Sequence, residues 1–179
     1  MKSIKLSLSL LFLSSLAACQ APVNSIQPQV TAPQVSSQST VNTARFNDTA
    51  KDALRWAEMD ARRWDFSADL VKVEGSDVRE NGKSGEWTFY FKAPFKRNVL
   101  KISGRNKEEV RDSFFGSEFN SLTWKVDSAQ VVEILKKNGL KKFPVLEMTL
   151  ESRFGLEWDV RTWDGRFTLD AKTGKITKK

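Results

Sequence analysis

The stretch GEWTFYFKAPFKRNVLKISG, residues 85–104, indicates the fold class because its large apolar side chains recur at every second position. These side chains are Trp87, Phe89, Phe91, Leu100 and Ile102. A period of two places successive side chains on opposite faces of a strand. Pro94 interrupts the pattern midway. We therefore expect two half-buried strands, at 86–92 and 98–103, joined by a turn.

The residues before this stretch predict a helix and then another strand. From 48 to 64 small and apolar side chains recur with the helical period. They are Ala50, Ala53, Leu54, Ala57, Ala61 and Trp64. Period-two alternation appears at 68–74, and Asn81 and Gly82 provide turn chemistry before the next strand. The alanines predict a helix that lies close on a sheet.

A second helix and a second group of strands follow later in the chain. Asp127 and Gln130 have the spacing of a capping box, and Gly139 is typical of a residue that ends a helix. Alternating runs come next, at 145–151, 157–163 and 166–171. The stretch LEWDVRTWDGRFTLDAKTG, residues 156–174, matches the opening stretch in strand order and in its Glu-Trp start.

These matches predict an α+β fold of two helix-plus-three-strand units, with the helices packed on antiparallel sheet. A further short helix is expected near 106–115. Residues 20–43 have no charged and no aromatic side chain, so they cannot bury enough apolar surface to offset their ordering entropy. The predicted division is a signal peptide at 1–18, a flexible tether at 19–45, a first half at 46–125 and a second half at 126–179.

The amino terminus contains the only cysteine of the chain, Cys19. Lys2 and Lys5 precede an apolar run that is too short to span a bilayer, a pattern typical of a secretory signal. Leu-Ala-Ala-Cys at 16–19 resembles the lipobox of bacterial lipoproteins, in which the cysteine sulfur is acylated and becomes the first residue. The alternative is ordinary signal cleavage beside an incidental cysteine.

The lipobox resemblance implies a membrane anchor at Cys19. Each buried methylene contributes about 0.8 kcal/mol, so two or three acyl chains would hold the protein on the bilayer. Acylation would also remove the thiol from disulfide, nucleophile and metal chemistry. Gln20 stands where the family's sorting rule places an inner-membrane aspartate, so the resemblance implies the periplasmic face of the outer membrane, with the cell surface as an alternative.

The second half also resembles a domain family. A helix, an aromatic strand with Trp158 and Val160, and the ending Asp-Ala-Lys-Thr-Gly-Lys at 170–175 are similar to the PepSY domain of secreted bacterial proteins and peptidase propeptides. The resemblance covers 126–179 and, more faintly, 49–103, where Lys-Ile-Ser-Gly replaces the ending. It implies helix-covered antiparallel sheet and a role in restraining peptidases or binding ligands, with no catalytic residues to transfer.

The composition argues against most enzyme classes. The chain has no histidine and no glycine-rich phosphate loop, so a common serine triad, a histidine-based zinc site and a nucleotide site are not expected. If Asp164-Gly165 forms a two-residue turn, Trp163 lies opposite Arg166, and Asp159 lies opposite Asp170. Two facing carboxylates could share a proton or hold a cation, but a cation site needs more oxygen ligands than this hairpin offers, and Arg161 and Lys172 are expected to neutralise the pair. We expect no catalytic residue, no metal and no cofactor.

Three residues of this hairpin are the candidate binding residues. Trp163, Arg166 and Arg161 are predicted to lie on the face that points away from the core. Aromatic and arginine side chains dominate binding hot spots. The alternative is that Trp163 stacks under the guanidinium of Arg166 in a purely structural contact. Trp56 and Trp124 fit no predicted core face and could line a groove between the halves.

The sequence therefore predicts a membrane-anchored protein that binds a protein or peptide. The formal net charge of +7 comes from basic residues that mostly alternate with acids. Lysine clusters at 136–142 and 172–179 leave open binding of a small ligand or of an anionic cell-wall polymer. A nucleic-acid partner is not expected, because no stacking motif accompanies the charge.

Overall fold

The computed structural model describes residues 47–113 and 116–178, all of which belong to one compact unit, Thr40–Lys179. The predictions for the signal peptide, Cys19 and the tether therefore lie outside the described residues. Neither helix in the described ranges has the length and apolar composition of a membrane-spanning segment.

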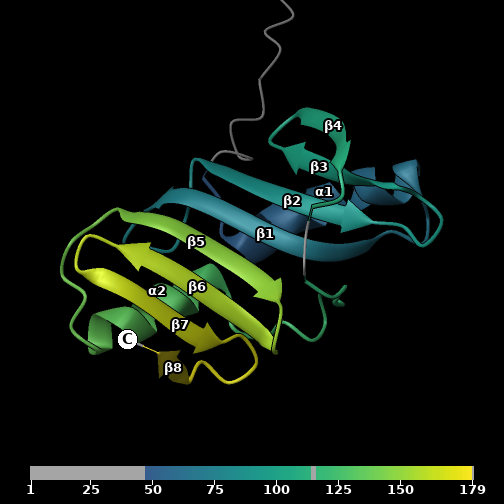
Figure 1. Ribbon diagram of the computed structural model, residues 1–179. Helices are drawn as coiled ribbons and strands as arrows, with labels where there is room; N and C mark the ends of the chain where they lie inside the picture. The colour runs from purple at the N-terminus through teal and green to yellow at the C-terminus, as the bar shows by residue number, and fades with distance from the viewer. Residues whose placement is uncertain (1–46, 114–115, 179) are drawn as a thin grey trace, which may run out of the picture. The chain divides into compact units, whose positions relative to one another are not determined.

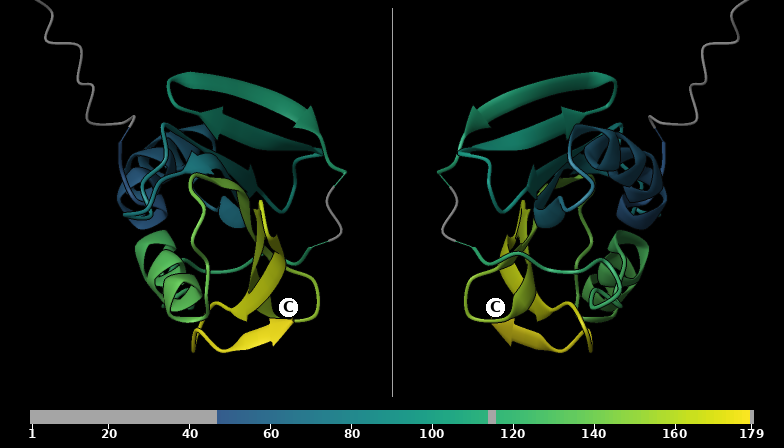
Figure 2. Two further views of the ribbon diagram at one scale, coloured as in Figure 1. Left: turned by 90° about the vertical axis from the view of Figure 1, so that its left-hand side faces the viewer. Right: turned by 90° about the vertical axis from the view of Figure 1, so that its right-hand side faces the viewer.

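The fold is an α+β arrangement in which two helices pack on one face of a single antiparallel sheet (Figures 1 and 2). The helices are α1 (Ala50–Trp64) and α2 (Ser128–Lys137). The strands are β1 (Asp69–Val78), β2 (Glu86–Lys92), β3 (Asn98–Ser103), β4 (Asn106–Arg111), β5 (Val145–Ser152), β6 (Leu156–Thr162), β7 (Gly165–Asp170) and β8 (Ile176–Lys178). Their order across the sheet is β4-β3-β2-β1-β5-β6-β7-β8.

The two halves share this sheet because β1 and β5 pair at its centre. Val73 lies opposite Leu150, and both side chains are fully buried. Each helix is followed by four strands, and the predicted repeat of a helix with three strands is not confirmed. The capping box of Asp127 and Gln130 at the start of α2 is confirmed.

The predicted short helix near 106–115 is wrong, because its first residues form β4. Gly104 takes a positive φ of 57° in a tight turn, which returns the chain antiparallel to β3. Val110 then pairs with the buried Val99, and Lys101 makes a 2.7 Å ion pair with Glu108. These contacts depend on the neighbouring strand, so the local sequence of β4 did not reveal them.

The hairpin of β6 and β7 has a different register from the predicted one. Trp163 and Asp164 form the turn, and Thr162 pairs with Gly165. Gly165 has a φ of 146°, while neither turn residue has a positive φ, so the glycine lies just after the turn rather than inside it. Consequently Arg166 lies opposite Arg161, and the predicted pairing of Trp163 with Arg166 is wrong.

The core lies between the helices and the sheet and is centred on three tryptophans. Trp158 is fully buried and makes edge-on contacts with Trp124 and Trp87, with ring centroids 5.5 Å and 6.4 Å away. The indole N–H groups of Trp124 and Trp158 both donate to the carbonyl oxygen of Val126, at 2.7 Å and 2.8 Å. The buried indoles therefore have the polar partners that burial requires.

Candidate binding surface on the open sheet face

The sheet face that points away from the helices is called the open face here. Residues of β1, β2, β3, β5 and β6 surround a hollow of about 480 Å³ on this face. The lining residues are Glu74, Gly75, Ser76, Glu86, Thr88, Tyr90, Lys101, Ser103, Leu146, Glu147 and Arg161. Most of them are polar or charged, because the helices already cover the apolar face.

Tyr90 and Glu74 are neighbours in the lining of this hollow. The Tyr90 hydroxyl donates a 2.7 Å hydrogen bond to the Glu74 carboxylate, and Lys72 makes a close ion pair with the same carboxylate. The Lys72 ammonium also lies 5.6 Å from the centroid of the Tyr90 ring. Burial, followed by the hydrogen bond to Glu74, raises the pKa of Tyr90. The phenol therefore stays protonated and acts as a donor near neutral pH.

Tyr90 and Glu74 were not among the candidate binding residues predicted from the sequence. The signal was present, because the period of two that places Trp87 and Phe89 in the core places Tyr90 on the opposite face. Whether that face contacts solvent, packs against a second layer or forms a hollow depends on the other strands. The sequence pattern could not decide this.

A second hollow, of about 570 Å³, lies farther along the open face over β5, β6 and β7. It is lined by Glu151, Arg153, Phe154, Glu157, Asp159, Arg166 and Thr168. Arg166 binds Asp159 through two nitrogens, and its Nε donates to Oδ1 at 2.6 Å. This pairing raises the pKa of the Arg166 guanidinium. The ion pair is exposed, so it orients the two groups more than it stabilises the fold.

Both arginines named from the sequence lie on the open face. Arg161 lines the first hollow and makes a 3.0 Å ion pair with Glu147, whereas Arg166 lines the second. Trp163 is 60% exposed at the turn of the hairpin, and its indole N–H donates to the carbonyl oxygen of Pro144 at 3.1 Å. The structure thus brings Arg161 and Arg166 together and places Trp163 at the end of the sheet beside them.

The facing carboxylates predicted at Asp159 and Asp170 are not opposite each other. Asp159 lies opposite Thr168, and Asp170 lies opposite Glu157, because the turn is displaced from the predicted position. Asp170 instead accepts hydrogen bonds from the side chain and backbone of Thr173. Among the described residues, no group of three or more histidine, cysteine, aspartate or glutamate side chains could hold a metal ion.

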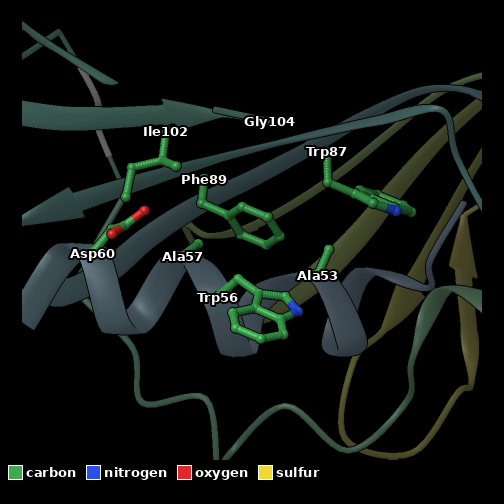
Figure 3. Close-up of a pocket in the computed structure, with 8 residues that line it drawn as sticks. All are labelled: Ala53, Trp56, Ala57, Asp60, Trp87, Phe89, Ile102 and Gly104. Atoms are coloured by element: carbon green, nitrogen blue, oxygen red, sulfur yellow. The ribbon is translucent and has the colours of Figure 1, made fainter. Parts of the chain in front are cut away.

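The two tryptophans without a predicted place have different surroundings. Trp124 is 1% exposed and belongs to the core. Trp56 lines a narrow gap of about 30 Å³ between α1 and the strands β2 and β3, and its ring lies below Phe89 and Ile102 in Figure 3. This gap lies within the first half, so the predicted groove between the halves is not formed by these residues. Its volume corresponds to about one water molecule and leaves no room for an organic ligand.

Comparison with known proteins adds no relative: no family model, no curated protein and no solved structure matches the chain.

Proposed function

We propose that this protein is an outer-membrane lipoprotein, anchored through Cys19, that binds a protein or peptide partner on its open sheet face. The observation that supports binding is the asymmetry of the sheet. Both helices cover one face, and the other face has two hollows lined by side chains of both charge signs. The sequence at 16–19 supports the anchor.

The charges in these hollows favour a peptide over an anionic polymer. Lys101 is paired with Glu108, Arg161 with Glu147, and Arg166 with Asp159. A polyanion would have to displace the acids, whereas a peptide with both charge signs can exchange partners with each pair. Mixed charge complementarity of this kind favours specificity of binding.

The absence of catalysis is part of the proposal. The Asp159 and Glu147 carboxylates are each occupied by an ion pair with an arginine, Arg166 and Arg161 respectively. The Tyr90 phenol has a raised pKa and is a poor nucleophile at neutral pH. These groups suit recognition better than proton transfer.

The resemblance to PepSY domains suggests which partner to test first. We propose that the two helix-and-strand halves are diverged copies of one unit and that the partner is an envelope peptidase or its substrate. The sequence ending at 170–175 and the matching Glu-Trp starts support this proposal. The sheet order is compatible with it, since each half has one helix and consecutive antiparallel strands.

The test is capture from envelope extract, followed by titration of each captured protein in purified form. The variant Arg161→Ala/Arg166→Ala removes both arginines of the open face. The matched control is Lys137→Ala/Lys141→Ala, which removes two exposed basic side chains, one at the end of α2 and one in the loop that follows it. We expect affinity to fall about 30-fold or more in the first variant, since a single hot-spot arginine contributes ~2 kcal/mol or more. Equal affinities for both variants would contradict the proposed surface.

A further inference from the structure

Three phenylalanines project almost completely into solvent from separate loops. Phe66 is 85% exposed, Phe95 98% and Phe154 101%. Phe66 lies between α1 and β1, Phe95 between β2 and β3, and Phe154 between β5 and β6. A single exposed apolar side chain needs no explanation, but three large ones from different loops do.

The three loops lie at the same end of the sheet. β1 begins at Asp69, which pairs with Lys92 at the end of β2. β5 ends one residue after Glu151, which pairs with Lys72 of β1. The arrowheads of β2 and β5 accordingly point to the same side in Figure 1. The loops containing Phe66, Phe95 and Phe154 follow or precede these strand ends, so we call them the phenylalanine end.

Basic residues flank each of the three phenylalanines. Residues 62–67, 93–98 and 152–155 together contain five arginine or lysine residues and one acid, Asp65. The basic residues are Arg62, Arg63, Lys96, Arg97 and Arg153. Arg153 directly precedes Phe154 in the sequence, and Arg97 follows Phe95 by two residues. Both arginines are exposed. Arg153 makes a 2.8 Å ion pair with Glu151, which lies within β5 rather than in the loop.

We propose that the phenylalanine end docks directly on the surface of an anionic lipid bilayer. A protein partner would need a separate pocket for each projecting ring, whereas a bilayer accepts each ring independently at the boundary between headgroups and acyl chains. The exposed Arg97, two residues after Phe95, can extend to the anionic headgroups while its stem contacts apolar surface, and Arg153 can exchange Glu151 for a headgroup. Apolar burial and electrostatic attraction together set the strength of such interfacial binding.

This docking is a property of the folded domain and is independent of the lipid proposed at Cys19. It also fixes an orientation, since the strand ends face the membrane. Phe154 and Arg153 line the second hollow, so that hollow lies next to the membrane, whereas the first hollow, lined by Tyr90, lies farther from it. A partner in the surrounding compartment could then reach the hollow around Tyr90. The inference deepens the proposed membrane location without depending on the identity of the partner.

The test uses the chain from Thr40, which has no acylation site, and vesicles of phosphatidylcholine and phosphatidylglycerol in equal parts. Cooperative melting establishes that this chain is folded. The variant is Phe66→Ser/Phe95→Ser/Phe154→Ser, and the control is Trp163→Ser, an exposed aromatic residue at the β6–β7 turn. Removing exposed rings leaves the core intact, so all three proteins are expected to melt alike.

We expect the unsubstituted chain and the Trp163→Ser control to sediment with these vesicles. The triple variant is expected to bind about 100-fold more weakly. This is roughly fivefold for each ring, which is less than the effect of burying a phenylalanine side chain completely. Arg97→Ala/Arg153→Ala is expected to weaken binding and to reduce its sensitivity to salt. Failure of the unsubstituted chain to bind would overturn the inference. So would equal binding by the triple variant and the control. Neither result bears on acylation of Cys19 or on partner binding at the first hollow, whose lining contains none of the substituted residues.

Discussion

The side chain of Ser128 accepts a hydrogen bond from the backbone N–H of Ala50 at 3.0 Å, which joins the beginnings of the two helices. The same hydroxyl donates to the carbonyl oxygen of Gly82 at 2.7 Å. Asp127 extends the contact, because its Oδ1 accepts from the backbone N–H of Lys51 at 3.1 Å. The cap of α2 therefore also satisfies the first amides of α1, which have no partner within their own helix.

Replacing Ser128 by Ala is expected to destabilise the fold by about 1 to 3 kcal/mol. The substitution leaves the buried N–H of Ala50 and the carbonyl oxygen of Gly82 without a partner, and the desolvation of both is then uncompensated. Chemical denaturation measures the change. Ser113→Ala, at an exposed serine, is the control and should change the free energy of unfolding by no more than about 0.5 kcal/mol. Equal stabilities for the two variants would show that the shared cap does not contribute.

Replacing Gly75 by Ala is expected to destabilise the protein by about 1 to 3 kcal/mol through overpacking. A Cβ at this position would meet the six-membered ring of Trp87 well inside van der Waals distance. Trp87 is 3% exposed, and its indole N–H donates to the carbonyl oxygen of Asp48, so the ring cannot move freely. Gly116→Ala is the control, because its nearest neighbour would be an ordinary 3.4 Å away. A thermal melt of Gly75→Ala that matches wild type would refute the packing argument.

The carboxylate of Asp170 is expected to stabilise the fold in a pH-dependent way. The hydrogen bond from the Thr173 side chain, and then that from the Thr173 backbone, lower the pKa of Asp170 below its ordinary value. A group whose pKa is lower in the folded state stabilises the fold above its unfolded pKa, and this contribution is lost as the pH falls through the folded pKa. The difference in free energy of unfolding between wild type and Asp170→Ala should thus be largest near neutral pH and decrease as acid is added. A difference that grows below pH ~4 would have the wrong sign.

The proposed anchor makes a prediction about membrane extraction. With residues 1–18 replaced by an ordinary cleavable signal peptide and Cys19 by Ala, the protein should move from the membrane fraction to the soluble fraction after a high-salt wash. The wash is needed because docking through the phenylalanine end would be salt-sensitive, whereas an acyl anchor is not. Mass spectrometry of the native amino terminus should show an acylated Cys19. An unmodified thiol there would exclude the anchor.

Several elements of the fold were predictable because their signals are local. The helical period of the alanines and the capping box of Asp127 identify α1 and α2. The period-two runs identify β2, β3 and β5 to β7. β4 was not predictable in this way, since Asn106–Arg111 is mostly polar and its strand structure comes from pairing with β3.

The candidate surface was predictable only in part. Arg161 and Arg166 were assigned to the correct face, because the alternation of side chains between the two faces of a strand follows from the local sequence. Their partners were not, since a turn displaced by one residue changes every cross-strand pair. Asp159 thereby became the ion-pair partner of Arg166 rather than the neighbour of Asp170.

By itself the sequence determined the α+β class, the inner and outer faces of most strands, and the resemblance at Cys19 that suggests an anchor. Only the tertiary structure decided that β1 and β5 join the halves into one sheet, that the open face is hollowed around Tyr90, and that three exposed phenylalanines lie at one end. The physical reason is the range of the interactions. Side-chain periodicity acts within a few residues, whereas strand pairing and the gathering of loops depend on contacts between residues far apart in the chain.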